Sequence, residues 1–370
     1  MAAEFDVVVA GYTGVDLAPT FPDRAGDVPL AQLLRPGKLI EVGPLEITPG
    51  GVVPNTGLAM STFGARVALM GLIGQDRLGD LLLGLLEGHG AAVHLRRTRV
   101  AGTAYGFVIA PPGTDRVFLE GPGCNAAFGA DDVDYELVAR SRLFHFGYPP
   151  LMPRLCADDG AELVTMLRRV RALGVATSLD MTLPDPQGPT GAVDWRALLA
   201  RVLPDVDIFT PSLEELLVML APAEVQRLAD AAGEGDIAAM APPALCEELA
   251  AEALALGSRI VLLKLGARGG LLRTGDVSDV ALALPPEAWG NQCLWLPAYP
   301  ADPARVCNAC GAGDAAVGGF LTALLNGEDA AMAGRLAMLA GRDSLYGVDT
   351  TSGLRAWAAM RAEASASAPQ

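Results

Sequence analysis

The chain has 370 residues, of which 51% are hydrophobic, and its formal net charge is −16 at pH 7. This length and composition allow one large core, and length alone would also allow two domains. The acidic balance argues against nucleic acid or an anionic membrane as a partner, because phosphate groups are bound largely through Lys and Arg. No stretch reaches the roughly 18 uncharged apolar residues of a membrane span. Residues 1–6 carry acids in place of a basic targeting segment, so we expect a cytoplasmic protein.

Strands and helices alternate along most of the chain. Residues 5–10 form a continuous apolar run, which is typical of a strand covered on both faces. Helical spacing over 159–173 leads into an expected strand at 175–179, and the same order recurs from 244–257 into 259–265. This pattern predicts an α/β fold with a doubly wound, mostly parallel sheet flanked by helices.

Two early segments interrupt this alternation. Residues 38–48 and 102–120 read as strands with turns and without helices between them. On residue patterns alone they could be an edge extension without function, since surface hairpins are common on α/β domains. We expect a single domain over 1–362 and a disordered Ala- and Ser-rich tail over 363–370.

A run of small residues late in the chain predicts an anion pocket. The residues Gly311, Ala312 and Gly313 precede an acid, Asp314, and a helix that we expect over about 314–326. Their small size lets a phosphate approach the backbone N–H groups left unpaired at the start of a helix. The Asp314 carboxylate beside such a phosphate could accept a proton from an incoming hydroxyl, or it could merely cap the helix.

Cys307 and Cys310 have a C-x-x-C spacing, while the other cysteines are scattered. A structural zinc site would need two further ligands at similar spacing, and the histidines do not supply them. We therefore expect reduced thiols lining a buried loop.

Three motifs together carry a resemblance to a known family. Residues 50–55 read G-G-V-V-P-N, residues 71–79 read G-L-I-G-Q-D-R-L-G, and residues 311–314 read G-A-G-D. In order and separation they resemble the two signature regions of the PfkB carbohydrate kinases, the ribokinase-like family. Further matches lie at 11–16, 123–125 and 264–270, so the resemblance spans most of the chain.

The resemblance implies a ribokinase-like fold in which the segments 38–48 and 102–120 form a small β lid over a sugar site. It also implies an ATP-dependent kinase that transfers the γ-phosphoryl group to a hydroxyl of a sugar, polyol or sugar-like acceptor. Asp314 would be the general base, and the backbone of Gly311, Ala312 and Gly313 the anion hole. The expected cofactors are ATP and Mg²⁺, with a monovalent cation left open, as is a homodimer formed through the lid.

The family pattern also assigns binding residues. Asp16, Gly51 and Asn55 fall at the positions that hold sugar hydroxyls, and Tyr105 and Asn125 are further acceptor candidates that could equally be packing or turn residues. From residue preferences alone, Asp16 could cap a turn and Asn55 could start a helix.

On the nucleotide side, the pattern assigns Gly266, Gly269, Lys264 and Asn308, and it places Glu215 near Mg²⁺. Lys264 takes a place where the family often has Thr, so it could reach a phosphate or point into solvent. Glu215 could also be an ordinary acid in the first turn of a helix.

The chain departs from the family pattern at several positions. Asn308 and Ala309 replace the first two residues of D-T-x-G-A-G-D, Ser212 replaces the Asn of N-x-x-E, and the D-x-N pattern reads Asp180-Met181-Thr182. Three readings therefore remain open: a sugar kinase, a nucleoside kinase, and a catalytically impaired sugar- or nucleotide-binding paralogue. A nicotinamide enzyme is disfavoured because the first glycine-rich turn lacks G-x-G-x-x-G.

Overall fold

The computed structural model describes residues 3–22, 25, 30–112, 117–233, 237–307 and 309–366. Within these residues, the main sheet has nine strands in the order β13-β12-β11-β10-β9-β8-β1-β4-β5. Every pairing from β5 to β11 is parallel, and β12 and β13 add an antiparallel edge. The strands are β1 (Phe5–Gly11), β4 (Val67–Gly74), β5 (Ala92–Thr98), β8 (Ser141–Gly147), β9 (Ala176–Asp180), β10 (Ile208–Phe209), β11 (Ile260–Lys264), β12 (Gly270–Thr274) and β13 (Cys293–Leu296).

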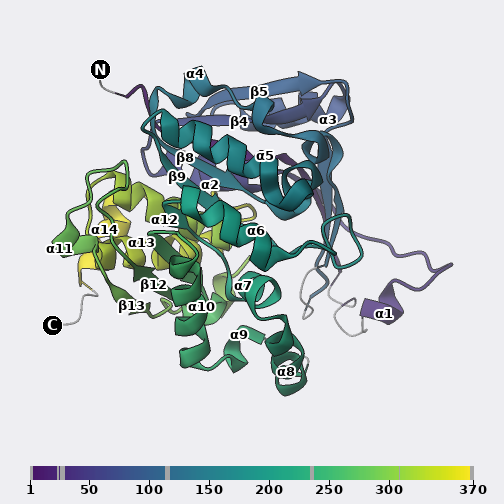
Figure 1. The fold of residues 1–370 in the computed structure, drawn as a ribbon. Coiled ribbons are helices and arrows are strands. Elements are labelled where there is room, and N and C mark those ends of the chain that lie inside the picture. Colours follow the sequence, from purple (N-terminus) through teal and green to yellow (C-terminus); the bar gives the residue numbers. More distant parts are fainter. Residues whose placement is uncertain are drawn as a thin grey trace.

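Helices cover this sheet, and this covering explains why its strands are apolar. Figure 1 shows α5 and α6 in front of the sheet and α12, α13 and α14 grouped at the left. Val7, Val8 and Val9 of β1 are fully buried, as expected for a strand covered on both faces. The helices are α1 (Leu30–Leu33), α2 (Val52–Thr62), α3 (Arg77–Leu86), α4 (Tyr135–Val138), α5 (Pro153–Ala172), α6 (Trp195–Val202), α7 (Leu213–Leu220), α8 (Pro222–Ala232), α9 (Ile237–Met240), α10 (Pro243–Ala255), α11 (Pro286–Trp289), α12 (Ala312–Leu325), α13 (Ala330–Ser344) and α14 (Trp357–Ala366).

The predicted doubly wound, mostly parallel fold is confirmed. Both helix–strand units read from the sequence are present, as α5 followed by β9 and as α10 followed by β11. The helix expected at 159–173 is the second part of α5, because the backbone leaves helical geometry over 157–160, where Asp158 has φ 51°. Trp289 of α11 packs edge-on against Phe320 of α12, with ring centroids 5.9 Å apart.

A second, four-stranded sheet, which we call the lid sheet, has the order β3-β2-β6-β7. Its strands are β2 (Gly14–Pro19), β3 (Leu45–Gly50), β6 (Ala104–Ile109) and β7 (Val117–Gly121). The predicted strand segment at 38–48 was too long at its start, because strand pairing begins only at Leu45. The sequence also did not predict β2, which follows β1 after only two residues.

The two faces of the lid sheet differ in chemistry. Asp16 of β2 pairs with Gly106 of β6, which in turn pairs with Glu120 of β7, so these three residues share one face. The neighbouring row places Tyr105 on the opposite face, where Phe107 also lies and its ring is 5.8 Å from that of Tyr105. Both aromatic side chains are 40% exposed. The lid sheet is therefore acidic on one face and apolar on the other.

Two expectations need correction, one at a loop and one at the C-terminus. The predicted disordered tail at 363–370 begins too early, because α14 continues to Ala366 and buries Ala364; the last four residues lie outside the described part. Cys307 is exposed and Cys310 half-buried, so the loop that carries them is not buried. None of the helices described in the structure combines the length and apolarity needed to cross a membrane.

Candidate active site

Polar side chains gather where the parallel strands end. Tyr148 follows β8, Asp180 ends β9, Ser212 follows β10 and Lys264 ends β11. The carboxyl ends of parallel strands meet at one edge of the sheet, which is where ligands bind in open α/β folds. The start of α12 reaches the same edge, because the Tyr148 hydroxyl donates a hydrogen bond to Asp314.

Asp314 is held by groups from two other parts of the chain, and a third part holds one of these groups. Its Oδ1 accepts a 2.5 Å hydrogen bond from the Tyr148 hydroxyl, and its Oδ2 accepts a 3.0 Å bond from Asn55 Nδ2. Thr350 Oγ1 donates to Asn55 Oδ1 at 2.9 Å. The predicted residues Asp314 and Asn55 are thus brought together. The helix cap is Gly311, so Asp314 is not the capping residue of α12.

The surroundings of Asp314 favour proton uptake. Burial raises its pKa above the ordinary range, and the hydrogen bonds from Tyr148, Asn55 and Thr56 together with the Lys264 charge offset only part of that effect. A carboxylate with a raised pKa is a better proton acceptor than an exposed one.

The predicted anion pocket begins with a left-handed residue. Gly311 has φ 77°, and a Cβ atom at this position would collide with Thr350 Oγ1, so the turn requires glycine. A Cβ atom on Gly313 would lie 3.8 Å from Lys264 Nζ. The lysine ammonium therefore flanks the small residues that open α12.

Lys264 does not point into solvent, and that alternative is wrong. Its Nζ donates to both carboxylate oxygens of Asp180, at 2.8 and 3.0 Å. Burial raises the pKa of Asp180 to about 7, while Lys264 lowers it. Burial lowers the pKa of Lys264, but Asp180, Glu215 and Asp314 outweigh that effect and raise it. The ammonium is thus the positive centre of a group of three carboxylates.

Glu215 forms a capping box at the start of α7. Its Oε2 accepts from the backbone N–H of Ser212 at 2.7 Å, and Ser212 Oγ accepts from the backbone N–H of Glu215 at 3.2 Å. This supports the reading of Glu215 as a first-turn acid, with Oε1 left for a further contact. In the part of the chain that the structure describes, no group of three or more His, Cys, Asp or Glu could hold a metal ion.

On the acceptor side, Asp16 and Gly51 lie near Tyr12 and the acidic face of the lid sheet. Burial raises the pKa of Asp16 to about 7, with further increases from the charges of Glu120 and Asp314. Gly51 has φ 89°, and a Cβ atom there would lie 2.6 Å from the Tyr12 carbonyl oxygen. The start of α2 therefore packs directly on the backbone after β1.

The structure puts the two further acceptor candidates, Tyr105 and Asn125, in different surroundings. Tyr105 lies on the apolar face of the lid sheet, opposite to Asp16, because side chains alternate along a strand. Asn125 is fully buried, and its Nδ2 donates to the Thr13 carbonyl at 2.8 Å. Asn125 therefore fixes the segment between β1 and β2 in this conformation.

The structure describes only some of the residues that were predicted to contact the nucleotide. Gly266 and Gly269, with φ 54° and 96°, form the turn that joins β11 to β12. A Cβ atom on Gly269 would collide with the Leu296 carbonyl of β13, so packing alone accounts for this glycine. Asn308 lies outside the described residues.

Sequence reasoning missed Tyr148, Thr350 and Glu120, and it noted Asp180 only as part of a motif. Tyr148 is the partner of Asp314 and has φ 65° immediately before two prolines. A bulky residue with positive φ is uncommon and often marks a functional site, but φ cannot be read from a sequence. The one available signal was position, since Tyr148 follows a buried strand.

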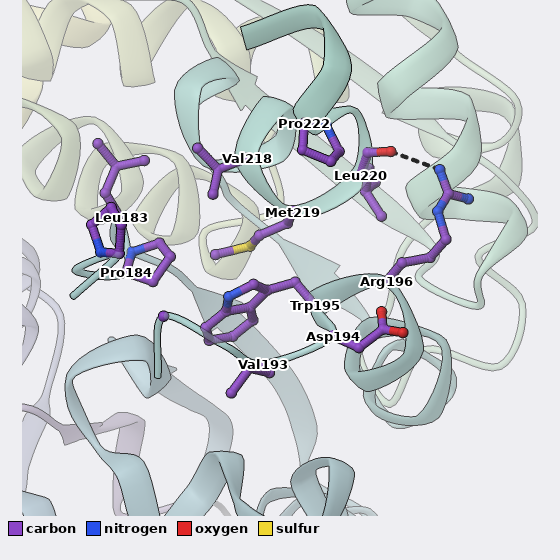
Figure 2. A pocket seen from close by; sticks show the side chains of 12 residues that line it. Leu183, Pro184, Val193, Asp194, Trp195, Arg196, Val218, Met219, Leu220 and Pro222 are labelled. Carbon is purple, nitrogen blue, oxygen red and sulfur yellow. Dashed lines mark hydrogen bonds between the residues drawn. The ribbon is translucent and has the colours of Figure 1, made fainter. Parts of the chain in front are cut away.

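A cavity of about 670 Å³ lies beside α6 and α7 (Figure 2). Trp195, Val218 and Met219 line it, and none of the predicted site residues does. Its charged neighbours have other partners: Asp194 caps α6, and Arg196 donates to the Leu220 carbonyl. The acid–base groups thus lie elsewhere, at the strand ends.

Structural comparison defines the fold class. A ribokinase from Arabidopsis thaliana, solved in complex with ribose and ATP, matches 98% of this chain and 99% of its own, with a TM-score of 0.71 and 19% sequence identity. The fold is therefore ribokinase-like. Residues 7–345 match the pfkB family carbohydrate kinase domain. The chain belongs to the pfkB family of carbohydrate kinases.

Curated relatives match over different lengths. A probable fructokinase-3 from Arabidopsis thaliana is 28% identical over 171 residues, which cover 45% of this chain and 48% of the relative. An uncharacterized sugar kinase from Archaeoglobus fulgidus is 24% identical over 281 residues, which cover 75% of this chain and 91% of the relative. The match to the plant enzyme thus spans about half of its length.

The pairing of Lys264 with Asp180 predicts a pH-dependent loss of stability. Lys264→Met leaves Asp180 buried without its partner, which should cost about 3–5 kcal/mol of unfolding free energy. Because the folded pKa of Asp180 is raised, its contribution to stability is lost as pH rises through about 7. Removing Lys264 raises that pKa further, so the deficit should be largest above this pH and shrink below it.

Urea unfolding across this pH range measures the effect. Lys38 is the other lysine of the chain and is exposed, so Lys38→Met is the matched control and should change stability little. Adding Asp180→Asn to Lys264→Met should recover part of the loss. A deficit that does not vary with pH would contradict the pairing as its cause.

Proposed function

We propose that the protein is an ATP-dependent kinase that phosphorylates a hydroxyl of a sugar or sugar-like acceptor. One observation carries the proposal: a buried carboxylate, Asp314, lies in the first turn of a helix opened by small residues and accepts a hydrogen bond from Asn55 of the motif at residues 50–55. An anion pocket and a proton acceptor are thereby adjacent. Family membership and the ribokinase structure with ribose and ATP support this reading.

In the proposed reaction, the acceptor hydroxyl gives its proton to Asp314 as its oxygen attacks the γ-phosphorus. The new bond joins the acceptor oxygen to phosphorus, and the bond from the γ-phosphorus to the bridging oxygen breaks to release ADP. The backbone N–H groups of Gly311, Ala312 and Gly313 would stabilise the charge on the transferred group. Asp16, Gly51 and Asn55 would hold the acceptor.

Lys264, Gly266, Gly269 and Asn308 are proposed to serve the nucleotide. The position of Lys264 next to Gly313 favours contact with a phosphate, since the ammonium is already beside the anion pocket. Mg²⁺ would neutralise charge on the triphosphate. The described carboxylates provide no ready set of ligands, so they fit an ion held mainly by phosphates and water, with Glu215 nearby. A monovalent cation stays an open part of the proposal.

Replacing Asp314 tests the reaction directly. Asp314→Asn keeps the size of the side chain but removes the proton acceptor, so acceptor-dependent ADP release should fall by about 10²–10⁴-fold. The measurement is ADP release from Mg-ATP with a panel of neutral sugars, amino sugars, sugar acids, polyols and nucleosides. Asp131→Asn, at an exposed acid, should retain full activity.

The panel also decides between the remaining readings. Preference for a nucleoside would establish the nucleoside kinase. Binding without turnover for every acceptor would support the impaired paralogue and overturn the kinase proposal.

We expect Tyr148 to influence the pH at which Asp314 loses its proton and can act as the base. Its hydroxyl donates to Asp314 and lowers the pKa of that carboxyl, so Tyr148→Phe should raise this pKa. The deprotonated form of Asp314 is the active base. In a plot of log kcat/KM against pH, the acidic limb should therefore move to higher pH. The readout is a pH–rate profile. Tyr135→Phe removes a hydroxyl that bonds to a backbone carbonyl elsewhere and should leave the limb unchanged.

We also propose that two copies pair through the apolar face of the lid sheet. Phe107 and Leu119 are directly paired on this face and are 40% and 54% exposed. Phe107→Asp should shift sedimentation from dimer to monomer, because a charge would enter the apolar contact. Val100→Asp, at an exposed loop position outside the lid sheet, should leave the dimer intact. Sedimentation of the wild-type protein as a monomer at micromolar concentrations would contradict the proposal.

A further inference from the structure

Two carboxylates meet on the inner face of the lid sheet because the residue between them has no side chain. Asp16, Gly106 and Glu120 form one register row across β2, β6 and β7. A Cβ atom on Gly106 would lie 2.8 Å from Glu120 Oε1 and 3.0 Å from Asp16 Oδ1. Both oxygens therefore border the space that a side chain would have filled.

The orientation of Glu120 is fixed by a hydrogen bond. The Tyr12 hydroxyl donates to Glu120 Oε2 at 3.1 Å. Tyr12 is itself buried, and its carbonyl oxygen contacts the start of α2 at Gly51. Oε1 of Glu120 has no hydrogen bond to the described residues and borders the same space above Gly106 as Asp16 Oδ1. One oxygen of the carboxylate is thus bound by Tyr12, and the other stays available.

The two carboxylates are placed to contact the far end of an acceptor. The pKa of Asp16 is raised first by burial, then by the charge of Glu120, and then by that of Asp314. Asp16 therefore lies within electrostatic reach of both Glu120 and the proposed base. An acceptor with its reacting hydroxyl at Asp314 would turn its other polar groups towards this pair.

Among the residues that the structure describes, no basic side chain acts on the pair. The charges that act on Asp16 are both acidic, and the one hydrogen bond that acts on Glu120 comes from the neutral Tyr12 hydroxyl. Partial desolvation raises the pKa of Glu120 as well, although this residue keeps an exposed surface. Two adjacent carboxyl groups of this kind accept hydrogen bonds and attract positive charge, but repel a third carboxylate.

We propose that Glu120 is a specificity-determining residue for the acceptor and acts jointly with Asp16. The pair binds hydrogen-bond donors on neighbouring carbon atoms, such as a diol or a hydroxyl next to an ammonium group, and it excludes sugar acids. This inference rests on the proposed kinase function and names its substrate class: neutral or amine-bearing sugars.

The test compares acceptor classes in the wild-type protein and in Glu120→Gln. Glutamine keeps the size of the side chain and can still accept the Tyr12 hydrogen bond. For the best neutral or amino sugar, kcat/KM should fall by about 10- to 100-fold, mainly through KM, because the lost contact is remote from the reacting atoms. The ratio of kcat/KM for gluconate to that for this sugar should rise. Glu46→Gln, at an exposed glutamate of the same sheet, should change neither quantity.

Direct binding separates a failure of this inference from a failure of the kinase proposal. The same sugars are titrated by calorimetry into the wild-type protein and both variants without nucleotide. If the wild-type protein binds neutral or amino sugars but phosphorylates none, the kinase proposal fails, and weaker binding by Glu120→Gln still supports the pair. A wild-type preference for gluconate, or an unchanged acceptor ranking in Glu120→Gln, overturns the inference. Absence of both turnover and binding for neutral and amino sugars overturns it too.

Discussion

The ion pair between Lys264 and Asp180 makes the rest of the site electrostatically possible. Asp180, Glu215 and Asp314 act on the same lysine at the strand ends, in a chain whose net charge is already strongly negative. Burying carboxylates without a cation would cost several kcal/mol each. One ammonium shared among them lowers that cost, and it does so beside the residues that open α12. A nucleotide that reaches this edge would therefore meet a positive group and helix N–H donors instead of acids alone.

The two ends of the proposed site differ in charge and in hydrogen-bonding groups. At the phosphate end, small residues and a helix start provide donors, and Lys264 provides charge. At the lid end, the described residues bring acids together without a cation, which suits a polyol and not a phosphate. Asn55 lies between the two ends, where it donates to Asp314 and accepts from Thr350. Under the proposed function, this division would let an acidic protein bind both an anionic cosubstrate and a hydroxyl-rich acceptor.

The sequence predicted the sheet and the Asp314–Asn55 region because both are encoded locally. Apolar runs and helical spacing predict parallel strands, and the glycine motifs mark the starts of α2 and α12. What it could not predict depends on pairing between distant segments. Tyr105 and Asp16 lie on opposite faces because of the register between β2 and β6, and Glu120 shares the face of Asp16 because both align with Gly106.

The burial of Lys264 also could not be predicted, because lysine side chains are mostly exposed. Its burial follows from the position of Asp180 on a strand two places away in the sheet. Tyr148 was missed for a related reason, since only the folded chain brings the end of β8 to the start of α12.

The chain contains few lysines and therefore few sites for amine-directed reagents. Apart from the chain terminus, Lys38 and Lys264 are its only primary amines, one exposed and the other sealed against Asp180. An amine-directed label added to the folded protein would mark Lys38 and spare Lys264 until the site opens. The extent of labelling at Lys264, read by mass spectrometry, would then report the opening of this edge of the sheet without any engineered probe.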